Sequence, residues 1–201
     1  MDESLSEWLA CRELADWTAR SPLLVERVRQ ALGSTEPVRV LDLCTGTGSN
    51  LRYLINRLPV RQKWLVVDRD ARLRQEVPSK LATWADARGC SIRTEGAVTY
   101  LRGTHYHCEI ETREMDLDRL DATLFAERNL VTASALLDLV SESWLRLLAA
   151  RCRDAGATAL FTLTYDGRSS CDPVEPEDDM VRELMNQHQR TDKGLGGPAE
   201  G

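Results

Sequence analysis

The segment that most constrains the fold reads as an apolar strand, a glycine turn, a helix, and a second strand that ends in an acid. Residues 38–43 form an apolar, β-branched run of the kind buried in parallel sheets, and Gly46 and Gly48 let the chain turn tightly before the helix. Asp68 lies twenty residues beyond Gly48. In a doubly wound sheet this spacing puts a carboxylate where it accepts hydrogen bonds from ribose hydroxyls. The pattern predicts an α/β sheet that binds a nucleoside.

The glycine loop differs from a dinucleotide-binding fingerprint in two ways. The third glycine of that fingerprint, which lets helix and strand pack closely beside a pyrophosphate, is replaced by Leu51. Asp42 stands four residues before Gly46, and its carboxylate would repel a pyrophosphate. The same negative charge suits the amino group and the sulfonium of S-adenosylmethionine. A nicotinamide-dependent oxidoreductase is therefore the weaker interpretation.

An acid followed by alternating glycines resembles the first motif of the class I S-adenosylmethionine-dependent methyltransferases. The resemblance implies a Rossmann-like, doubly wound, mainly parallel α/β sheet and S-adenosyl-L-methionine as cofactor. The sequence departs from the family at Cys44, where the usual loop has its first glycine; a side chain there crowds the methionine moiety or requires a positive φ that cysteine tolerates poorly. The resemblance implies that the cofactor-binding residues are Asp42, Cys44, Gly46, Gly48, Asp68, Asp116, Leu117 and Thr132.

A second segment, Thr-Ala-Ser-Ala-Leu-Leu-Asp-Leu-Val at residues 132–140, resembles a group of bacterial class I methyltransferases. Residues 8–16 and 188–194 share this resemblance. It implies a small-molecule methyl acceptor near the carboxyl ends of the strands, where open α/β folds bind ligands. The candidates for proton removal or substrate orientation are Asp138, Tyr165 and His188. For Asp138, the sequence favours a structural role within the loop and a contact with substrate equally.

Apolar periodicity predicts two helices in the first 33 residues, with Trp8 and Trp17 packed in the core rather than touching substrate. A helix over residues 71–88 contains Pro78, which is expected to split or bend it. Alternating residues after Gly89 predict a hairpin that leads into the third parallel strand. The other expected strands cover residues 38–43, 64–68, 130–133 and 157–165, and the last two helices cover 141–156 and 179–189.

The length and composition fit one domain. A chain of 201 residues with 42% hydrophobic content can fill one core but not two of ordinary size. We expect a helical lead-in over residues 1–34 and a cofactor-binding domain over 35–201. Methyltransferases of this class close their sheet with two further strands, so the resemblance predicts a domain that is incomplete at its C-terminus. The uncovered strand edge is a possible site of homo-oligomerisation.

Charge and cysteine content exclude several other classes. A net charge of −6 without a Lys/Arg run makes a nucleic-acid partner unlikely. No apolar run is long enough to cross a membrane and the start, Met-Asp-Glu, does not fit a signal peptide, so a cytoplasmic location is expected. The six cysteines contain no C-x-x-C pair, and His105 and His107 lack a third ligand at useful spacing. Neither a disulfide framework nor a metal site is expected.

The leading hypothesis is a methyltransferase that acts on a small molecule. The alternative is a catalytically silent methyltransferase-like scaffold or a partner-dependent subunit, which Cys44 and the missing strands motivate. Both hypotheses share a fold, and they differ in whether the cofactor site binds its ligand.

Overall fold

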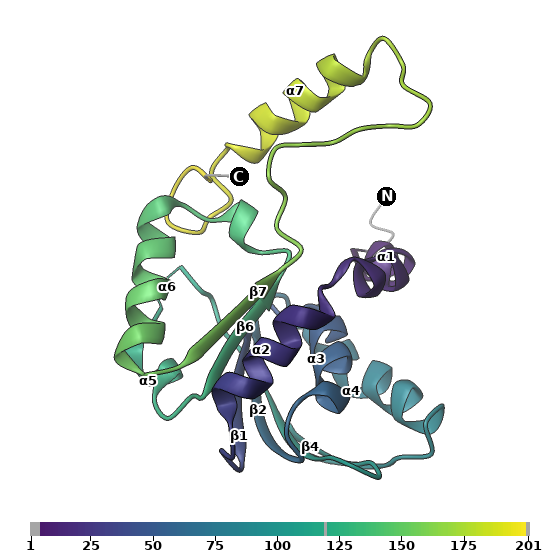
Figure 1. The fold of residues 1–201 in the computed structure, drawn as a ribbon, viewed down its shortest axis with the longest axis vertical. Helices are drawn as coiled ribbons and strands as arrows, with labels where there is room; N and C mark the ends of the chain where they lie inside the picture. Colours follow the sequence, from purple (N-terminus) through teal and green to yellow (C-terminus); the bar gives the residue numbers. More distant parts are fainter. Residues whose placement is uncertain (1–4, 119, 200–201) are drawn as a thin grey trace.

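A computed structural model describes residues 5–118 and 120–199, which form a seven-stranded sheet with helices on both faces. The strand order is β3-β4-β5-β2-β1-β6-β7 (Figure 1). Five neighbouring strands are parallel, as the apolar strand runs predicted: β1 (Val38–Leu43), β2 (Arg61–Asp68), β5 (His107–Glu114), β6 (Leu130–Ser134) and β7 (Thr158–Thr162). The predicted doubly wound, mainly parallel α/β fold is confirmed.

The register of the central strands brings the predicted acids to one edge of the sheet. Asp42 near the end of β1 pairs with Val66 of β2 on one side and with Thr132 of β6 on the other. Asp68 is the last residue of β2. All parallel strands therefore end on the same side of the molecule, where ligands bind in open α/β sheets.

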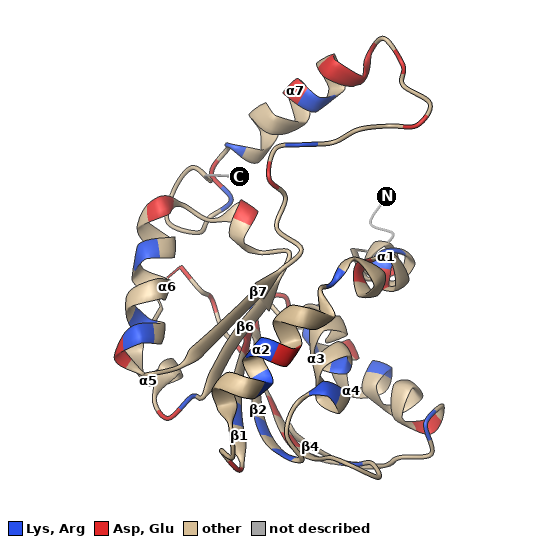
Figure 2. Ribbon diagram, in the orientation of Figure 1, with Lys and Arg blue, Asp and Glu red and all other residues tan. Residues whose placement is uncertain are grey.

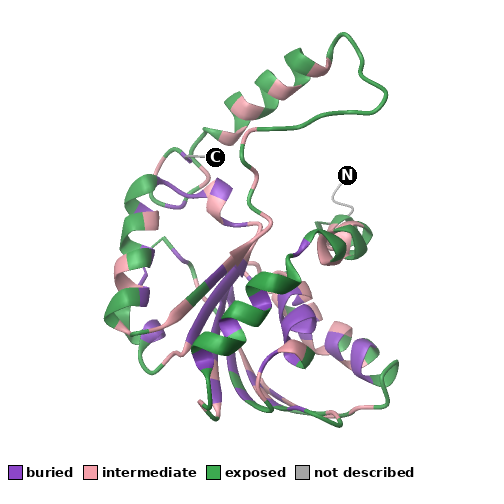
Figure 3. Cartoon of the chain, in the orientation of Figure 1, coloured by how far each residue is buried: buried purple, intermediate pink, exposed green. Residues whose placement is uncertain are grey.

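Two hydrophobic clusters pack the sheet, one on each face. The first joins the helices α2, α3 and α4 to the sheet, and the second joins α5 and α6. In Figure 3 the buried residues concentrate in the central strands, whereas α1 and α7 have no buried residue. The helical elements are α1 (Leu5–Ala19), α2 (Pro22–Leu32), α3 (Ser49–Leu54), the 3-10 turn η1 (Ile55–Arg57), α4 (Ala71–Asp86), α5 (Ala122–Phe125), the 3-10 turn η2 (Leu137–Leu139), α6 (Glu142–Asp154) and α7 (Asp178–Gln189).

The predicted hairpin is confirmed and extends the sheet at one edge. β3 (Ser91–Glu95) pairs with β4 (Val98–Arg102), which in turn pairs antiparallel with β5. Gly96 turns the hairpin at a φ of 60°. β3 forms one edge of the sheet and β7 the other.

Three local predictions were wrong or incomplete. Of the two effects expected of Pro78, a split does not occur: α4 is continuous through the proline, and Val77 and Leu81 on either side of it are buried. The last parallel strand ends at Thr162 rather than residue 165, since Leu163 takes a φ of 58° that leaves the extended conformation. Trp8 is 56% exposed and lies under the Arg12 guanidinium instead of in the core.

Trp17 is partly buried against the first cluster, as predicted, and its indole nitrogen donates a hydrogen bond to Ser49 at 3.3 Å. In the described part of the chain, no helix combines the length and the apolar character needed to cross a membrane.

Candidate functional site

A cavity of about 340 Å³ opens at the carboxyl ends of β1 and β2. Loops after four parallel strands contribute to its wall, and apolar side chains form most of the surface. The C-terminal segment after α7 supplies the remaining side. The lining residues are Cys44, Asp68, Arg69, Met115, Leu117, Ala135, Leu136, Leu139, Lys193 and Leu195.

Asp42 is fully buried and sits at the centre of a hydrogen-bond network. One carboxylate oxygen accepts from the Thr45 hydroxyl at 2.7 Å and the other accepts from the Asn50 amide at 2.7 Å. Burial raises the pKa of Asp42 to about 6, while these two hydrogen bonds and the nearby Arg20 guanidinium oppose the shift. Asp42 therefore fixes the turn and the start of α3.

Arg20, between α1 and α2, reaches the same network although no sequence motif marks it. Its guanidinium donates to Asn50 at 2.7 Å, to the Thr162 hydroxyl at 2.8 Å and to the Ser134 hydroxyl at 2.9 Å. The side chain is buried, and desolvation lowers its pKa. The side-chain amide of Asn50 accepts from Arg20 and donates to Asp42, so it links the buried cation to the buried anion beneath the site. Arg20 thus ties the helical lead-in to the ends of β6 and β7.

Asp68 holds the glycine loop through its carboxylate. One oxygen accepts from the Gly46 backbone nitrogen at 2.7 Å, and the other accepts from the Asp70 backbone nitrogen at 2.9 Å. A carboxylate has about four lone-pair positions, so two stay open for further donors. Asp68 also lines the cavity, which is the position expected of a ribose-binding acid.

Cys44 adopts the conformation that glycine favours, with a φ of 50°. Its thiol lines the cavity, and burial beside Asp68 and Asp42 raises the pKa of Cys44 to about 12. The thiol is therefore protonated at neutral pH. Gly46 and Gly48 have φ values of 55° and 83°, so every second residue from Cys44 to Gly48 takes a left-handed backbone conformation.

The other predicted cofactor residues divide into cavity wall, strand interior and surface. Leu117 lines the cavity, and its carbonyl accepts from the Trp144 indole at 2.6 Å. Thr132 is buried in β6, where its hydroxyl donates to the Leu160 carbonyl at 2.8 Å and accepts from Asn50 at 3.0 Å. Asp116 follows β5 by two residues, and its carboxylate is exposed and accepts from the Asp118 backbone at 3.2 Å.

The three candidates for proton removal are not gathered at one point. Each contacts α7 or the residues just after it: Asp138 accepts from Gln189 at 3.2 Å, and Tyr165 donates to Asn186 at 2.8 Å. His188 is exposed and lies 3.1 Å from the Lys193 amine. Asp138 is the one placed beside the cavity wall, between Leu136 and Leu139, and its second oxygen is buried without a hydrogen-bond partner.

The C-terminal segment closes one side of the cavity, which the sequence did not predict. Leu195 is buried in the second hydrophobic cluster, and its carbonyl accepts from the Ser141 backbone at 3.2 Å. Gly196 lies so close to Ser141 that a Cβ there would come within 2.6 Å of the hydroxyl. Lys193 and Leu195 therefore line the cavity although, along the sequence, they come more than fifty residues after the preceding lining segment, residues 135–139.

Methyltransferases are among the solved structures that are similar to this chain. The plantazolicin methyltransferase BpumL, solved with SAH, superposes with a TM-score of 0.54 over 93% of this chain and 63% of its own, at 9% identity. The chain has the fold of the class I S-adenosylmethionine-dependent methyltransferases. No family model and no curated protein matches the sequence.

Two further structures are similar at lower scores. An O-methyltransferase family protein from Burkholderia thailandensis matches 89% of this chain and 46% of its own, with 17% identity and a TM-score of 0.48. A S-adenosylmethionine-dependent methyltransferase from Clostridium acetobutylicum ATCC 824 matches 73% and 50%, with 14% identity and a TM-score of 0.48. The chain spans less than two thirds of each of these three proteins.

Within the described ranges, no three His, Cys, Asp or Glu side chains are placed to hold a metal ion.

Proposed function

We propose that this chain binds S-adenosyl-L-methionine in the cavity at the carboxyl ends of β1 and β2 and transfers its methyl group to a small-molecule acceptor. The observation that carries the proposal is Asp68, which combines a place on the cavity wall with a hydrogen bond from the glycine-loop backbone at 2.7 Å. A carboxylate held in this way presents its open lone pairs to ribose hydroxyls.

The remaining walls fit an adenosine. Leu117 and Leu136 offer apolar surface for a flat base, as small-molecule sites do with most of their lining. Asp116 follows Met115 of the wall and is the acid that the resemblance assigns to the adenine amino group. The buried carboxylate of Asp42 supplies negative charge beneath the loop, which favours a cationic ligand.

When bound, the cofactor supplies an electrophilic methyl group on a cationic sulfur. The chain then has to hold the acceptor in line, exclude water and take up a proton where the acceptor loses one. Asp138 is the best placed of the three candidates for this last role because its buried oxygen without a partner lies beside the cavity wall. Tyr165 and His188, which contact α7 and its C-terminal extension, are proposed to orient the acceptor.

Calorimetric titration with S-adenosylhomocysteine tests the cofactor site directly. We expect binding by the wild-type chain and weaker binding by Asp68→Ala. A folded chain that releases no heat with this ligand would reject the proposal.

The second candidate is a silent scaffold, favoured by the left-handed Cys44 in the loop. It predicts a normal circular-dichroism spectrum together with no heat in the same titration.

A further inference from the structure

A second cavity, of about 550 Å³, lies on the sheet at the opposite end of β2 from Asp68. Its wall comes from β2, β3, β4 and β5, and it contains four cationic side chains but one carboxylate, Glu109. The chain as a whole has a net charge of −6, so this local excess of positive charge runs against the overall composition. The cations are Arg61, Lys63, Arg93 and Arg102.

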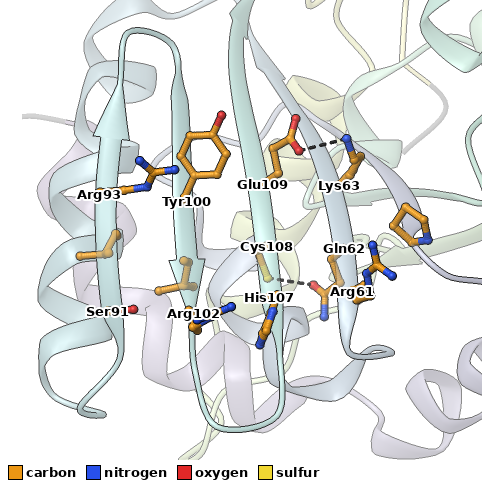
Figure 4. Close-up of a pocket in the computed structure, with 13 residues that line it drawn as sticks. Arg61, Gln62, Lys63, Ser91, Arg93, Tyr100, Arg102, His107, Cys108 and Glu109 are labelled. Atoms are coloured by element: carbon orange, nitrogen blue, oxygen red, sulfur yellow. Dashed lines mark hydrogen bonds and ion pairs between the residues drawn. The ribbon is translucent and has the colours of Figure 1, made fainter.

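The strand register arranges the side chains in two rows across the sheet (Figure 4). Arg61, His107 and Arg102 are aligned neighbours on β2, β5 and β4 and form the first row. Because adjacent strands are about 4.8 Å apart, the two arginines start about 10 Å apart, on either side of the imidazole. The second row holds Lys63, Glu109, Tyr100 and Arg93.

The two rows differ in how their charges are neutralised. In the second row Lys63 lies 3.0 Å from Glu109, while Arg93 pairs with Glu95 and covers the Tyr100 ring. In the first row neither Arg61 nor Arg102 has an ion-pair partner among the described residues, and both are exposed. Their neighbours in sequence, Gln62 and Leu101, are buried in the first hydrophobic cluster or beside it. Because side chains alternate between the two faces of a sheet, the side chains of the first row lie on the face opposite to the first hydrophobic cluster, which we call the open face.

We propose that the first row binds the phosphate group of a small phosphorylated molecule. Guanidinium groups match phosphate oxygens with paired donors, and two of them on either side of an imidazole can hold a group with two negative charges. Ser91, next to Arg102 in the register, adds a hydroxyl. Glu109 in the second row is placed to accept from a hydroxyl on the rest of the ligand.

The surroundings favour a small anion over a nucleic-acid strand. Glu95 and Glu111 follow the second row along β3 and β5, so carboxylates border the row on that side. A long polyanion would meet these acids and a chain of net charge −6, whereas a small phosphate ester fits within the cavity. The site does not involve the residues proposed for methyl transfer and stands independently of that function.

Pyrophosphate at low ionic strength is the probe, measured by calorimetry on the full chain. The variant R61Q/R102Q removes the two unpaired charges, and we expect it to bind about tenfold more weakly or worse. The control R27Q/R72Q removes two charges from exposed positions on α2 and α4, and we expect less than about a twofold change. A third variant, R61K/R102K, keeps the charge but loses the paired donors, so intermediate affinity is expected.

Thermal unfolding and S-adenosylhomocysteine binding should be the same in all four proteins. The assignment is overturned if the folded wild-type chain releases no heat with pyrophosphate, or if R61Q/R102Q and R27Q/R72Q lose affinity equally. A single-stranded oligonucleotide that binds far more tightly than pyrophosphate, and loses affinity in R61Q/R102Q, would replace the small ligand with a nucleic acid.

Discussion

The charged residues at the two ends of β2 differ in their burial and in their partners. At its carboxyl end Asp68 and neighbouring Asp42 are buried, and every carboxylate oxygen accepts a hydrogen bond. At its amino end Arg61 is exposed and has no ion-pair partner among the described residues. A buried charge needs partners to offset desolvation, whereas an exposed charge is solvated by water. Changes to the buried acids of the cleft should therefore alter both stability and binding, and changes to the arginines on the open sheet face should alter binding alone.

The acidic residues of the loop before α7 follow the second pattern and are exposed. Figure 2 shows acids along the loop before α7 and at its start, where the chain is exposed. They contribute to the net charge of −6 without belonging to any buried network.

The largest expected effect is on the buried cation. Arg20→Ala removes three hydrogen bonds and leaves Asp42 buried without its nearby positive charge. We expect a loss of about 3–5 kcal/mol in the free energy of unfolding, measured in urea. Arg27→Ala, on the exposed face of α2, should change it by less than about 0.5 kcal/mol. Equal effects would contradict the distinction between buried and exposed charge.

The next effect is a pH dependence that comes from Asp42. Its pKa of about 6 in the folded chain exceeds the unfolded value, so the unfolded carboxyl releases its proton first as the pH rises. Stability should therefore fall between pH 4 and pH 6, by about 3 kcal/mol from this group, and stay lower above that range. Unfolding of wild type and Asp42→Asn across pH 4 to 7 isolates the contribution, because the amide does not titrate. Parallel curves would show that Asp42 titrates normally.

Asp68→Ala should weaken S-adenosylhomocysteine binding by about 2–3 kcal/mol, because it removes a charged acceptor for ribose hydroxyls. The structure adds a cost of about 1–2 kcal/mol in stability, since the backbone nitrogens of Gly46 and Asp70 lose their acceptor. Asp68→Asn keeps one acceptor oxygen and should recover part of the stability but little of the affinity. Full affinity in both variants would remove Asp68 from the cofactor site.

The smallest effect is expected at Cys44. Glycine relieves the left-handed backbone by about 1 kcal/mol but loses a similar amount of chain entropy, so Cys44→Gly should leave stability nearly unchanged. It also removes a side chain from the cavity wall, and cofactor affinity should rise because the methionine moiety gains room. Calorimetric titration of wild type and Cys44→Gly with S-adenosylhomocysteine measures the difference in affinity. Weaker binding by the glycine variant would show that the thiol supports the ligand.

Much of the fold followed from local patterns. Continuous apolar runs marked the parallel strands, alternation marked the hairpin, and Ser141 marked the start of α6. Errors arose where packing overrode a local rule, as at Pro78, where buried neighbours keep α4 intact. For the site, the acids Asp42 and Asp68 were found because their spacing reflects one strand-helix-strand unit.

The sequence by itself determined the sheet, its glycine turn and the acids at the strand ends, because each depends on residues close together in the chain. Only the tertiary structure brought Arg20 within 2.8 Å of Thr162, 142 residues away, and Lys193 into the cavity wall. It also aligned Arg61, His107 and Arg102 in one row. Such contacts depend on strand register and helix placement, which are set by the packing of the whole core, so no local periodicity encodes them.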